Sequence, residues 1–438
     1  MDLKNKLEQL KRERKIRSKS QWVKDTWKEV GKDEELSTKE KLEHLINLTR
    51  EEKKPRQKMP AFEALPREPL QFFEIPYDLD AKYGNINLSL GLEVERDILI
   101  WLSNDQAFEN LDLSTALFID LETTGLSGGA GVVPFNIGMG YYRDDKFMVA
   151  QYFLGDLAEE EIMIKELGQF FSENNFQSVV TYNGKNFDLP ILETRFILYR
   201  KPFLLGKLPH LDFLYPARML WKHKYENCRL FHLAREEIGA DRSEDIASAE
   251  IPMIYFRYLE TGDFELVEPI LYHNREDILS LLGIVIAGAL IFSEDKEKFM
   301  ADAMDFYGAG RVMEKRGAVE KSAYFFQRAL KTGLPEEISL QAKKKVSYYF
   351  KKSENWGKAV SLWQEIASLE NPSMQQLYSI RELAMYHEHK QKKYEEAKEI
   401  TEEGLVLSLN FSPFYEKDFS HRLERLNKKI RRQKQREV

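Results

Sequence analysis

Short apolar runs, separated by charged residues, glycine or proline, mark the middle of this chain. Short runs bounded by turn residues are typical of buried strands, whereas longer segments with apolar residues three or four apart are typical of helices. We therefore predict strands over 116–119, 132–142, 146–154 and 178–182, and helices over 157–171 and 189–199. From there to about residue 290 the pattern is mostly helical. Antiparallel strands followed by alternating helix and strand indicate a mixed α/β sheet with helices on its faces.

Residues 300–420 show a different pattern, in which small and apolar residues recur at helical spacing. Three segments align: Ser322-x3-Phe326-x2-Ala329, Ala359-x3-Trp363-x2-Ile366 and Ala397-x3-Thr401-x2-Gly404. Their period, a little under 40 residues, lies near the roughly 34-residue repeat of tetratricopeptide (TPR) arrays. The pattern predicts an all-α, TPR-like helical-repeat domain through which a protein partner would bind. An ordinary helical bundle is the alternative.

Three further segments flank these two domains. Residues 1–60 form a charged N-terminal arm, either solvated or able to bind nucleic acid or a partner. Residues 61–95 are rich in proline and aromatic residues. Because proline excludes a regular interior helix or strand, this segment is predicted to be an ordered strap packed on the main α/β domain, residues 96–295. Residues 421–438 are strongly basic, which fits either a solvated tail or a contact with phosphates.

Composition and charge narrow the class of protein. The 438 residues carry a formal net charge of -7, which argues against coating nucleic acid by bulk charge but not against a local basic groove. The single cysteine, Cys228, rules out an internal disulfide, and the charged start has no apolar leader. The longest apolar run, 284–292, is far shorter than the roughly 20 residues of a membrane helix. We expect a cytoplasmic protein without a membrane partner.

The first candidate for chemistry is the stretch FIDLETTGL, in which an apolar strand runs into Asp120 and Glu122. Alternation along a strand places residues i and i+2 on the same face, so both carboxylates point the same way. Two like charges at this spacing repel unless a cation lies between them, and a divalent metal bound through oxygen meets that need. The alternative is an acidic pair that ends an edge strand in solvent.

Further carboxylates also stand at the ends of predicted elements. Asp188 follows a glycine turn where a helix starts, a position that a simple helix cap would also explain. Asp212 follows another apolar stretch. His273 and Asp277 are four apart at the start of a strongly apolar helix, so they share a face that we expect to point inward. An exposed surface pair is the alternative for these two residues.

Together these residues predict a metal centre. Asp120, Glu122, Asp188 and Asp277 are the candidate ligands of two divalent cations, magnesium or manganese, and His273 is the candidate general base. Neighbouring polar residues are candidates for substrate contact or for supporting the ligands: Thr123, Thr124, Asn183, Asn186, Asp212, Tyr272 and Asn274. The sequence contains neither a cysteine and histidine cluster typical of zinc nor a phosphate-binding G-x4-G-K-[ST] loop.

Three motifs carry a family resemblance. FIDLETTGL, TYNGKNFDLPILETR and HNREDILSL, in this order, resemble the three exonuclease motifs of the DEDD superfamily, which has a ribonuclease H-like fold. The surrounding segments SGGAGVVPFNIGMG, LDFLYPARMLW and EDIASAEIPMIYFRYLETGD are similar to the YprB-like family. The resemblance covers roughly residues 110–295 strongly, and a helical-repeat tail is similar too.

The resemblance implies a metal-dependent 3′-to-5′ exonuclease that acts on DNA in repair, alongside a partner helicase. By motif, Asp120, Glu122, Asp188 and Asp277 would be the four acidic ligands. The last motif departs from the pattern, because His273 has the spacing of the superfamily's tyrosine branch and Tyr272 that of its histidine branch. We favour His273 as the base, with Tyr272 as the alternative. An RNA-processing exonuclease and a catalytically silent scaffold are the rival functions.

Overall fold

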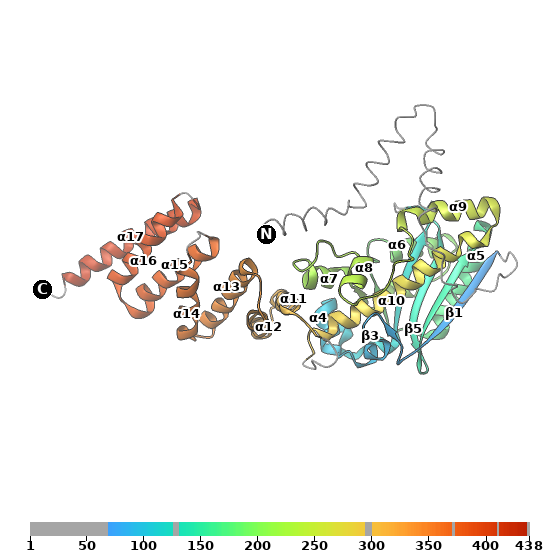
Figure 1. Ribbon diagram of the computed structural model, residues 1–438, viewed down its shortest axis with the longest axis horizontal. Helices are drawn as coiled ribbons and strands as arrows, with labels where there is room; N and C mark the ends of the chain where they lie inside the picture. Colours follow the sequence, from blue (N-terminus) through green and yellow to red (C-terminus); the bar gives the residue numbers. More distant parts are fainter. Residues whose placement is uncertain (1–68, 126–130, 294–299, 370–372, 410, 436–438) are drawn as a thin grey trace, which may run out of the picture. The chain divides into compact units, whose positions relative to one another are not determined.

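The computed structural model describes residues 69–125, 131–293, 300–369, 373–409 and 411–435 (Figure 1). The predicted N-terminal arm, the first part of the predicted strap and the last three residues of the chain lie outside the described residues. No helix in the described ranges is long and apolar enough to cross a membrane.

A six-stranded mixed sheet organises the first part of the described chain, in the strand order β1-β6-β5-β4-β7-β8. Its strands are β1 (Leu70–Asp78), β4 (Ala116–Thr123), β5 (Pro134–Arg143), β6 (Lys146–Leu154), β7 (Ser178–Thr181) and β8 (His210–Asp212). β1, β6, β5 and β4 pair antiparallel with their neighbours, whereas β4, β7 and β8 pair in parallel. A separate hairpin joins β2 (Lys82–Tyr83) to β3 (Ile86–Asn87).

Helices cover this sheet. They are α4 (Arg96–Ser103), α5 (Glu160–Asn174), α6 (Asp188–Leu198), α7 (Leu214–Trp221), α8 (Leu230–Glu236), α9 (Ile251–Thr261) and α10 (Glu268–Leu290). The long α10 crosses β4, β5 and β6 in Figure 1 and is buried along nearly its whole length. The predicted strands and helices of this region are all present, with ends shifted by a few residues. The mixed α/β sheet predicted from the sequence is therefore confirmed.

The predicted strap needs a correction. Residues 70–78 form the edge strand β1, which pairs with β6 from Leu70 opposite Leu154 to Asp78 opposite Lys146. Pro76 lies within this strand, opposite Met148. Proline is excluded from interior strands because it lacks an N–H group, but an edge strand tolerates it. The exclusion of an interior strand therefore agrees with the structure, and the correction is that part of the predicted strap is an edge strand of the sheet.

Alternation along β4 divides the core into two clusters. Leu117 and Ile119 enter the hydrophobic cluster shared with α5 and α9, whereas Ala116 and Phe118 enter the cluster shared with α7, α8 and the second half of α10. The strand extends through Glu122, so the face of Phe118 continues into Asp120 and Glu122. Both carboxylates thus leave the core on the side that α10 covers.

The C-terminal part of the chain is entirely helical within the described residues. Its helices are α11 (Ala303–Lys315), α12 (Val319–Thr332), α13 (Glu336–Lys352), α14 (Trp356–Ala367), α15 (Met374–Tyr386), α16 (Tyr394–Ser408) and α17 (Pro413–Lys434). Each helix packs on the next one in sequence. The aligned small and apolar positions of the three predicted repeats fall on α12, α14 and α16, and all of them are buried. The predicted helical region is confirmed.

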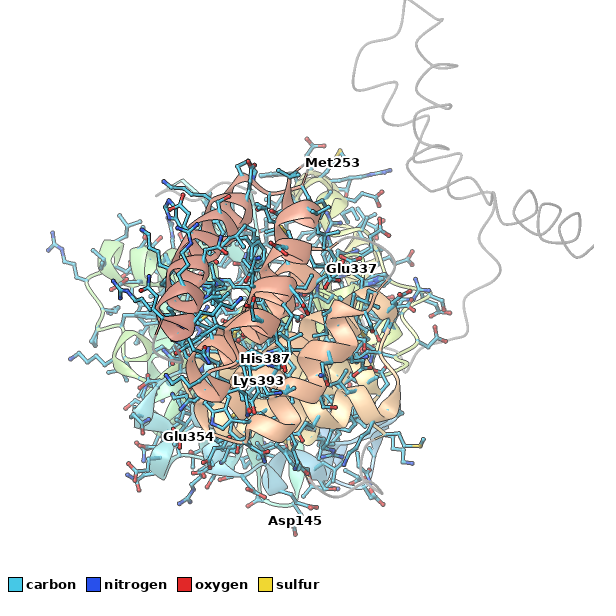
Figure 2. All side chains as sticks on the ribbon, turned by 90° about the vertical axis from the view of Figure 1, so that its left-hand side faces the viewer. Asp145, Met253, Glu337, Glu354, His387 and Lys393 are labelled. Carbon is cyan, nitrogen blue, oxygen red and sulfur yellow. The ribbon has the colours of Figure 1, made fainter. Side chains whose placement is uncertain are left out.

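The predicted basic tail belongs to α17, since that helix continues to Lys434. Arg422, Arg425 and Lys429 all bind Glu388, at 2.8, 2.8 and 2.9 Å. Glu388 lies in η8 (His387–Gln391), a single π-helical turn. Lys393, just after this turn, donates its N–H to the carbonyl of His387 at 3.0 Å, and the two residues lie close together in Figure 2. Part of the basic run therefore stabilises the helical region rather than lying free in solvent.

The helical region packs directly on α7. Trp221 at the end of α7 donates to the Asp305 carboxylate of α11 at 3.1 Å, and the Lys224 ammonium lies 2.8 Å from the same carboxylate. Gly308 faces the backbone of Leu220, which a Cβ at that position would overlap. Glycine is therefore required for α11 to approach α7 this closely.

Candidate metal centre

One cavity of about 420 Å³ collects the predicted acidic residues from three elements. β4 contributes Asp120 and Glu122, α6 contributes Asp188, and α10 contributes His273 and Asp277. All five predicted catalytic residues thus line the same cavity, although they are distributed over more than 150 residues of sequence.

The loop before α6 places Asp188 at this cavity. Asp212 at the end of β8 accepts hydrogen bonds from the N–H groups of Asn183 at 2.7 Å and Lys185 at 3.0 Å. Asn183 adopts a left-handed conformation with φ of 73°, which asparagine tolerates, and itself lines the cavity. Asp212 does not line the cavity. Its contacts indicate that it supports the loop that carries Asp188.

One turn of α10 presents His273 and Asp277 together. The Nε2 atom of His273 lies 3.4 Å from Asp277 Oδ2 and 3.6 Å from Glu122 Oε1. One ligand atom from each of these three residues falls within 4.8 Å of the others, as a single metal ion would require. Asp120 and Asp188 line the same cavity but stand outside this closest group. Like charges repel, and both carboxylates have other partners: Asn274 for Asp120, and backbone N–H groups for Asp188.

The two neighbours of His273 point elsewhere. Tyr272 does not line the cavity; its ring lies 5.2 Å from the Arg275 guanidinium. Asn274 donates to Asp120 Oδ2 at 2.9 Å and accepts from Gln151 Nε2 at 2.9 Å. A Cβ on Gly138 of β5 would overlap the Asn274 amide, so glycine is needed there. The geometry thus favours His273 over Tyr272 as the group that faces the cavity, and makes Asn274 a support for Asp120.

The remaining polar candidates shape the loops around the cavity. Thr123 lines it and donates to the carbonyl of Gly125 at 2.8 Å. Thr124 does not line it; its hydroxyl accepts from Val133 N–H at 3.0 Å. Asn186 is exposed and donates to Tyr215 Oη at 3.2 Å. Of these two threonines, Thr123 is therefore the one that lines the cavity.

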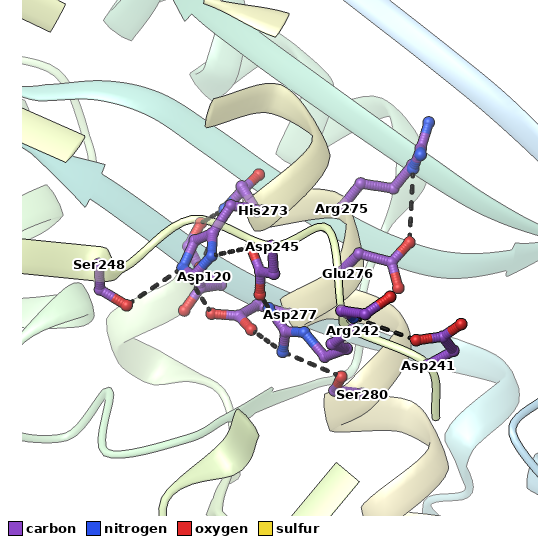
Figure 3. Close-up of polar contacts among 12 residues, drawn as sticks. Asp120, Asp241, Arg242, Asp245, Ser248, His273, Arg275, Glu276, Asp277 and Ser280 are labelled. Carbon is purple, nitrogen blue, oxygen red and sulfur yellow. Dashed lines mark hydrogen bonds and ion pairs between the residues drawn. The ribbon is translucent and has the colours of Figure 1, made fainter. Parts of the chain in front are cut away.

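Three residues of the site were not predicted from the sequence. Arg242, Asp245 and Ser248 come from the segment between α8 and α9, and Figure 3 shows them beside His273 and Asp277. Asp245 Oδ1 lies 2.6 Å from His273 Nδ1, and Arg242 pairs with both Asp245 and Asp277. The segment lacks the apolar periodicity that marks the other motifs. The similarity to the YprB-like family, stated for a segment that starts at Glu244, was a signal for Asp245 and Ser248 but not for Arg242.

Burial and like charge dominate the electrostatics of the cavity. Burial and the charges of Asp277 and Asp188 raise the pKa values of Asp120 and Glu122 well above their usual range. Burial, with the charges of Asp212 and Asp277, raises the pKa of Asp188 to about 7, although N–H groups act in the opposite direction. Burial lowers the pKa of His273, but the charges of Asp277 and Asp245 outweigh it and raise that pKa overall.

These residues fit a hard divalent cation. Carboxylate oxygens are the ligands that magnesium and manganese prefer, and the cavity offers four carboxylates and one imidazole nitrogen. Arg242 is the one guanidinium or ammonium group that pairs with these carboxylates in the described ranges. Since buried like charges are costly without a counter-ion, the donor set indicates a cation site.

Comparisons with known proteins agree with this arrangement. Residues 117–287, from β4 to α10, match the RNase H superfamily. The chain is also 30% identical over 364 residues to a Bacillus subtilis (strain 168) protein described as "Uncharacterized protein YprB". That similarity covers 81% of this chain and 85% of the relative, so it includes both the sheet and much of the helical region.

Proposed function

This chain belongs to the RNase H superfamily as a YprB-like protein, and from that premise we propose that it is a metal-dependent 3′-to-5′ exonuclease that hydrolyses phosphodiester bonds in DNA during repair. The observation that carries the proposal is the convergence of Asp120, Glu122, Asp188 and Asp277 with His273 on one cavity. A scaffold would have no need to bury four carboxylates together, because their repulsion lowers stability.

Each residue has a role in the proposed reaction. Asp120, Glu122, Asp188 and Asp277 would hold magnesium or manganese ions, which supply activation of water and neutralisation of charge on the phosphate. The Nε2 atom of His273 faces the cavity and would accept the proton of the attacking water. Asn274 keeps Asp120 in place through its hydrogen bond at 2.9 Å.

The preference for DNA and for the 3′ end comes from the resemblance to the DEDD superfamily, and RNA is the second candidate substrate. The same resemblance suggests a helicase as partner. We assign partner binding to the helical region, whose pocket of about 260 Å³ is lined by Phe326, Tyr348, Tyr378 and Lys344 among others. A helicase would supply the separated strands on which an exonuclease acts.

Cleavage of end-labelled nucleic acids tests the proposal. Single-stranded DNA, double-stranded DNA and matched RNA, labelled at the 5′ end, are incubated with magnesium, manganese or EDTA. The wild type is compared with Asp120→Asn, whose amide oxygen can still accept from Asn274, and with Asp145→Asn in the exposed β5–β6 turn as the matched control.

We expect metal-dependent ladders that shorten from the 3′ end for the wild type and for Asp145→Asn, and none for Asp120→Asn. Preferential cleavage of RNA would replace the DNA assignment with the RNA-processing one. If folded wild-type protein cleaves no substrate with either metal, the scaffold function is favoured instead.

A further inference from the structure

The segment between α8 and α9 brings two buried charged side chains against α10 that the proposed reaction does not itself use. The side chains of Arg242 and Asp245 are 0% and 1% exposed. Neither charged group is accessible to solvent, and neither residue lines the cavity. A buried charge is retained only with partners, so the identity of those partners indicates what the pair does.

The contacts form a continuous path from this segment to the cavity (Figure 3). Asp245 Oδ2 accepts from Arg242 Nη2, and Asp245 Oδ1 lies 2.6 Å from His273 Nδ1. The other guanidinium nitrogen, Arg242 Nη1, donates to Asp277 Oδ1 and, at 3.3 Å, to Ser280 Oγ. Arg242 therefore connects Asp245, which contacts the His273 ring, to Asp277, which lines the cavity.

This arrangement dictates which nitrogen of His273 carries the proton. An ionised carboxylate only accepts hydrogen bonds, so the Nδ1 atom facing Asp245 must be the donor. In the neutral ring the lone pair then belongs to Nε2. That atom lies 3.3 Å from Ser248 Oγ and 3.4 Å from Asp277 Oδ2, at the wall of the cavity.

We propose that Asp245 is a positioning residue, which fixes His273 with Nδ1 protonated and Nε2 unprotonated toward the cavity. Arg242 holds the carboxylates of Asp245 and Asp277 in place. The proposal rests on the proposed function, because it assigns how the general base is prepared. Arg242 is itself fixed, since its guanidinium lies 5.2 Å from the centre of the Phe231 ring and contacts Ser280.

A purely structural ion pair is the competing explanation, and the substitution Asp245→Asn separates the two. Arg242 has only donors, so the new amide must turn its oxygen toward the guanidinium. Its NH2 group then faces His273 Nδ1, which has to become the acceptor. The ring proton moves to Nε2, and the cavity loses its base although size and fold are conserved.

The first readout is the tautomer of His273 and does not require activity. Ring nitrogen correlations are recorded on 15N-histidine-labelled protein with magnesium, at a pH where the ring is neutral. The signal of His273, one of eight histidines, is assigned by its loss in His273→Gln. We expect protonated Nδ1 in the wild type and protonated Nε2 in Asp245→Asn. Asp241→Asn, an exposed change four residues away, is the matched control.

The second readout is kinetic. In Asp245→Asn and Asp245→Ala we expect kcat to fall roughly 10- to 100-fold, the range for residues that orient a site histidine, with KM changed less than about twofold. Magnesium binding, followed by the shift in melting temperature, should persist in Asp245→Asn. Wild-type activity and an unchanged tautomer in that variant would overturn the positioning role. If the wild type cleaves nothing, the proposed function fails, while the tautomer measurement still decides the role of Asp245.

Discussion

Two regions of the molecule bury carboxylates: the helical region buries Glu388, and the β4–α10 cavity buries several acidic side chains. Glu388 is surrounded by positively charged side chains, whereas the carboxylates of the cavity have mainly other carboxylates as neighbours. Arg422, Arg425 and Lys429 surround Glu388, whose side chain has no exposed surface. Burial alone would raise the pKa of Glu388, but hydrogen bonds from Arg425 and Lys429 hold it at about 2. This carboxylate is ionised and fully paired.

The cavity shows the opposite balance. Asp120, Glu122 and Asp188 have raised pKa values because burial and other carboxylates oppose their ionisation. A buried carboxylate that serves the fold comes with cations of the same chain, whereas a group of carboxylates that lacks them is suited to a cation from outside. The difference in partners, more than burial itself, separates a structural acidic residue from a candidate ligand.

The largest effect should come from neutralising one carboxylate in each region. Asp120→Asn should lower the cleavage rate by more than about 100-fold, beyond the range found when a residue behind a metal ligand is lost. Glu388→Gln should leave the rate per folded molecule unchanged, since Glu388 is no part of the cavity. Single-turnover cleavage at saturating magnesium measures both. Similar losses in the two variants would mean that the comparison does not separate function from stability.

Stability should respond in the reverse order. Glu388→Gln leaves Arg422 and two other cations without their carboxylate, which should destabilise the helical region by about 3 kcal/mol, as for other buried pairs that lose one partner. Without metal, Asp120→Asn should raise stability, because it removes one of several repelling charges. Urea unfolding in EDTA tests both changes. Glu395→Gln, at a carboxylate that is 56% exposed, is the control and should behave like the wild type.

The sequence predicted the cavity residues well because each follows a local rule. Asp120 and Glu122 follow from alternation along a strand, Asp188 from the start of a helix, and His273 with Asp277 from the spacing of four. These rules fix where a side chain points relative to its own element. The apolar residues next to them pack in the core and so determine which face of the sheet α10 covers.

Contacts between elements could not be predicted in this way. Asp245 reaches His273 from an irregular segment, and Asn274 reaches Asp120 only because β5 has glycine opposite it. The basic run near the C-terminus was predicted to be a solvated tail or a phosphate contact, because nothing in its sequence indicates that Glu388 would be its partner. Contacts between residues of different elements depend on tertiary packing. The periodicity of a single sequence does not reveal them.

Divalent cations should stabilise the cavity and leave the surroundings of Glu388 unchanged, because Glu388 already has positively charged partners, whereas the carboxylates of the cavity have mainly other carboxylates as neighbours. At a magnesium concentration 100 times its dissociation constant, binding should stabilise the wild type by about 2.7 kcal/mol. The gain should be largely lost in Asp120→Asn and retained in Glu388→Gln. Thermal unfolding with and without magnesium, at constant ionic strength set with potassium chloride, measures it. An equal gain in both variants would indicate non-specific ion binding.

The smallest effect should be the dependence of metal-free stability on pH. The folded-state pKa of Asp188, about 7, lies above the ordinary value of 3.8. A carboxyl group with a raised pKa contributes stability that is fully present below the unfolded-state pKa and is lost as pH rises through the folded-state value. Lowering the pH from 8 to 6 in EDTA should therefore stabilise the wild type, by an amount on the order of 1 kcal/mol.

Glu388 cannot produce this slope, because its contribution is lost only as pH falls toward about 2. Asp305 at the junction with α7 also has a pKa of about 7, so part of the slope belongs to it. Comparing Asp188→Asn with the wild type isolates the part due to Asp188, since Asp305 is the same in both. We expect a shallower slope in the variant. Identical slopes would mean that ionisation of Asp188 does not lower the stability of the folded protein. The electrostatic difference between the cavity and Glu388 would then have no support.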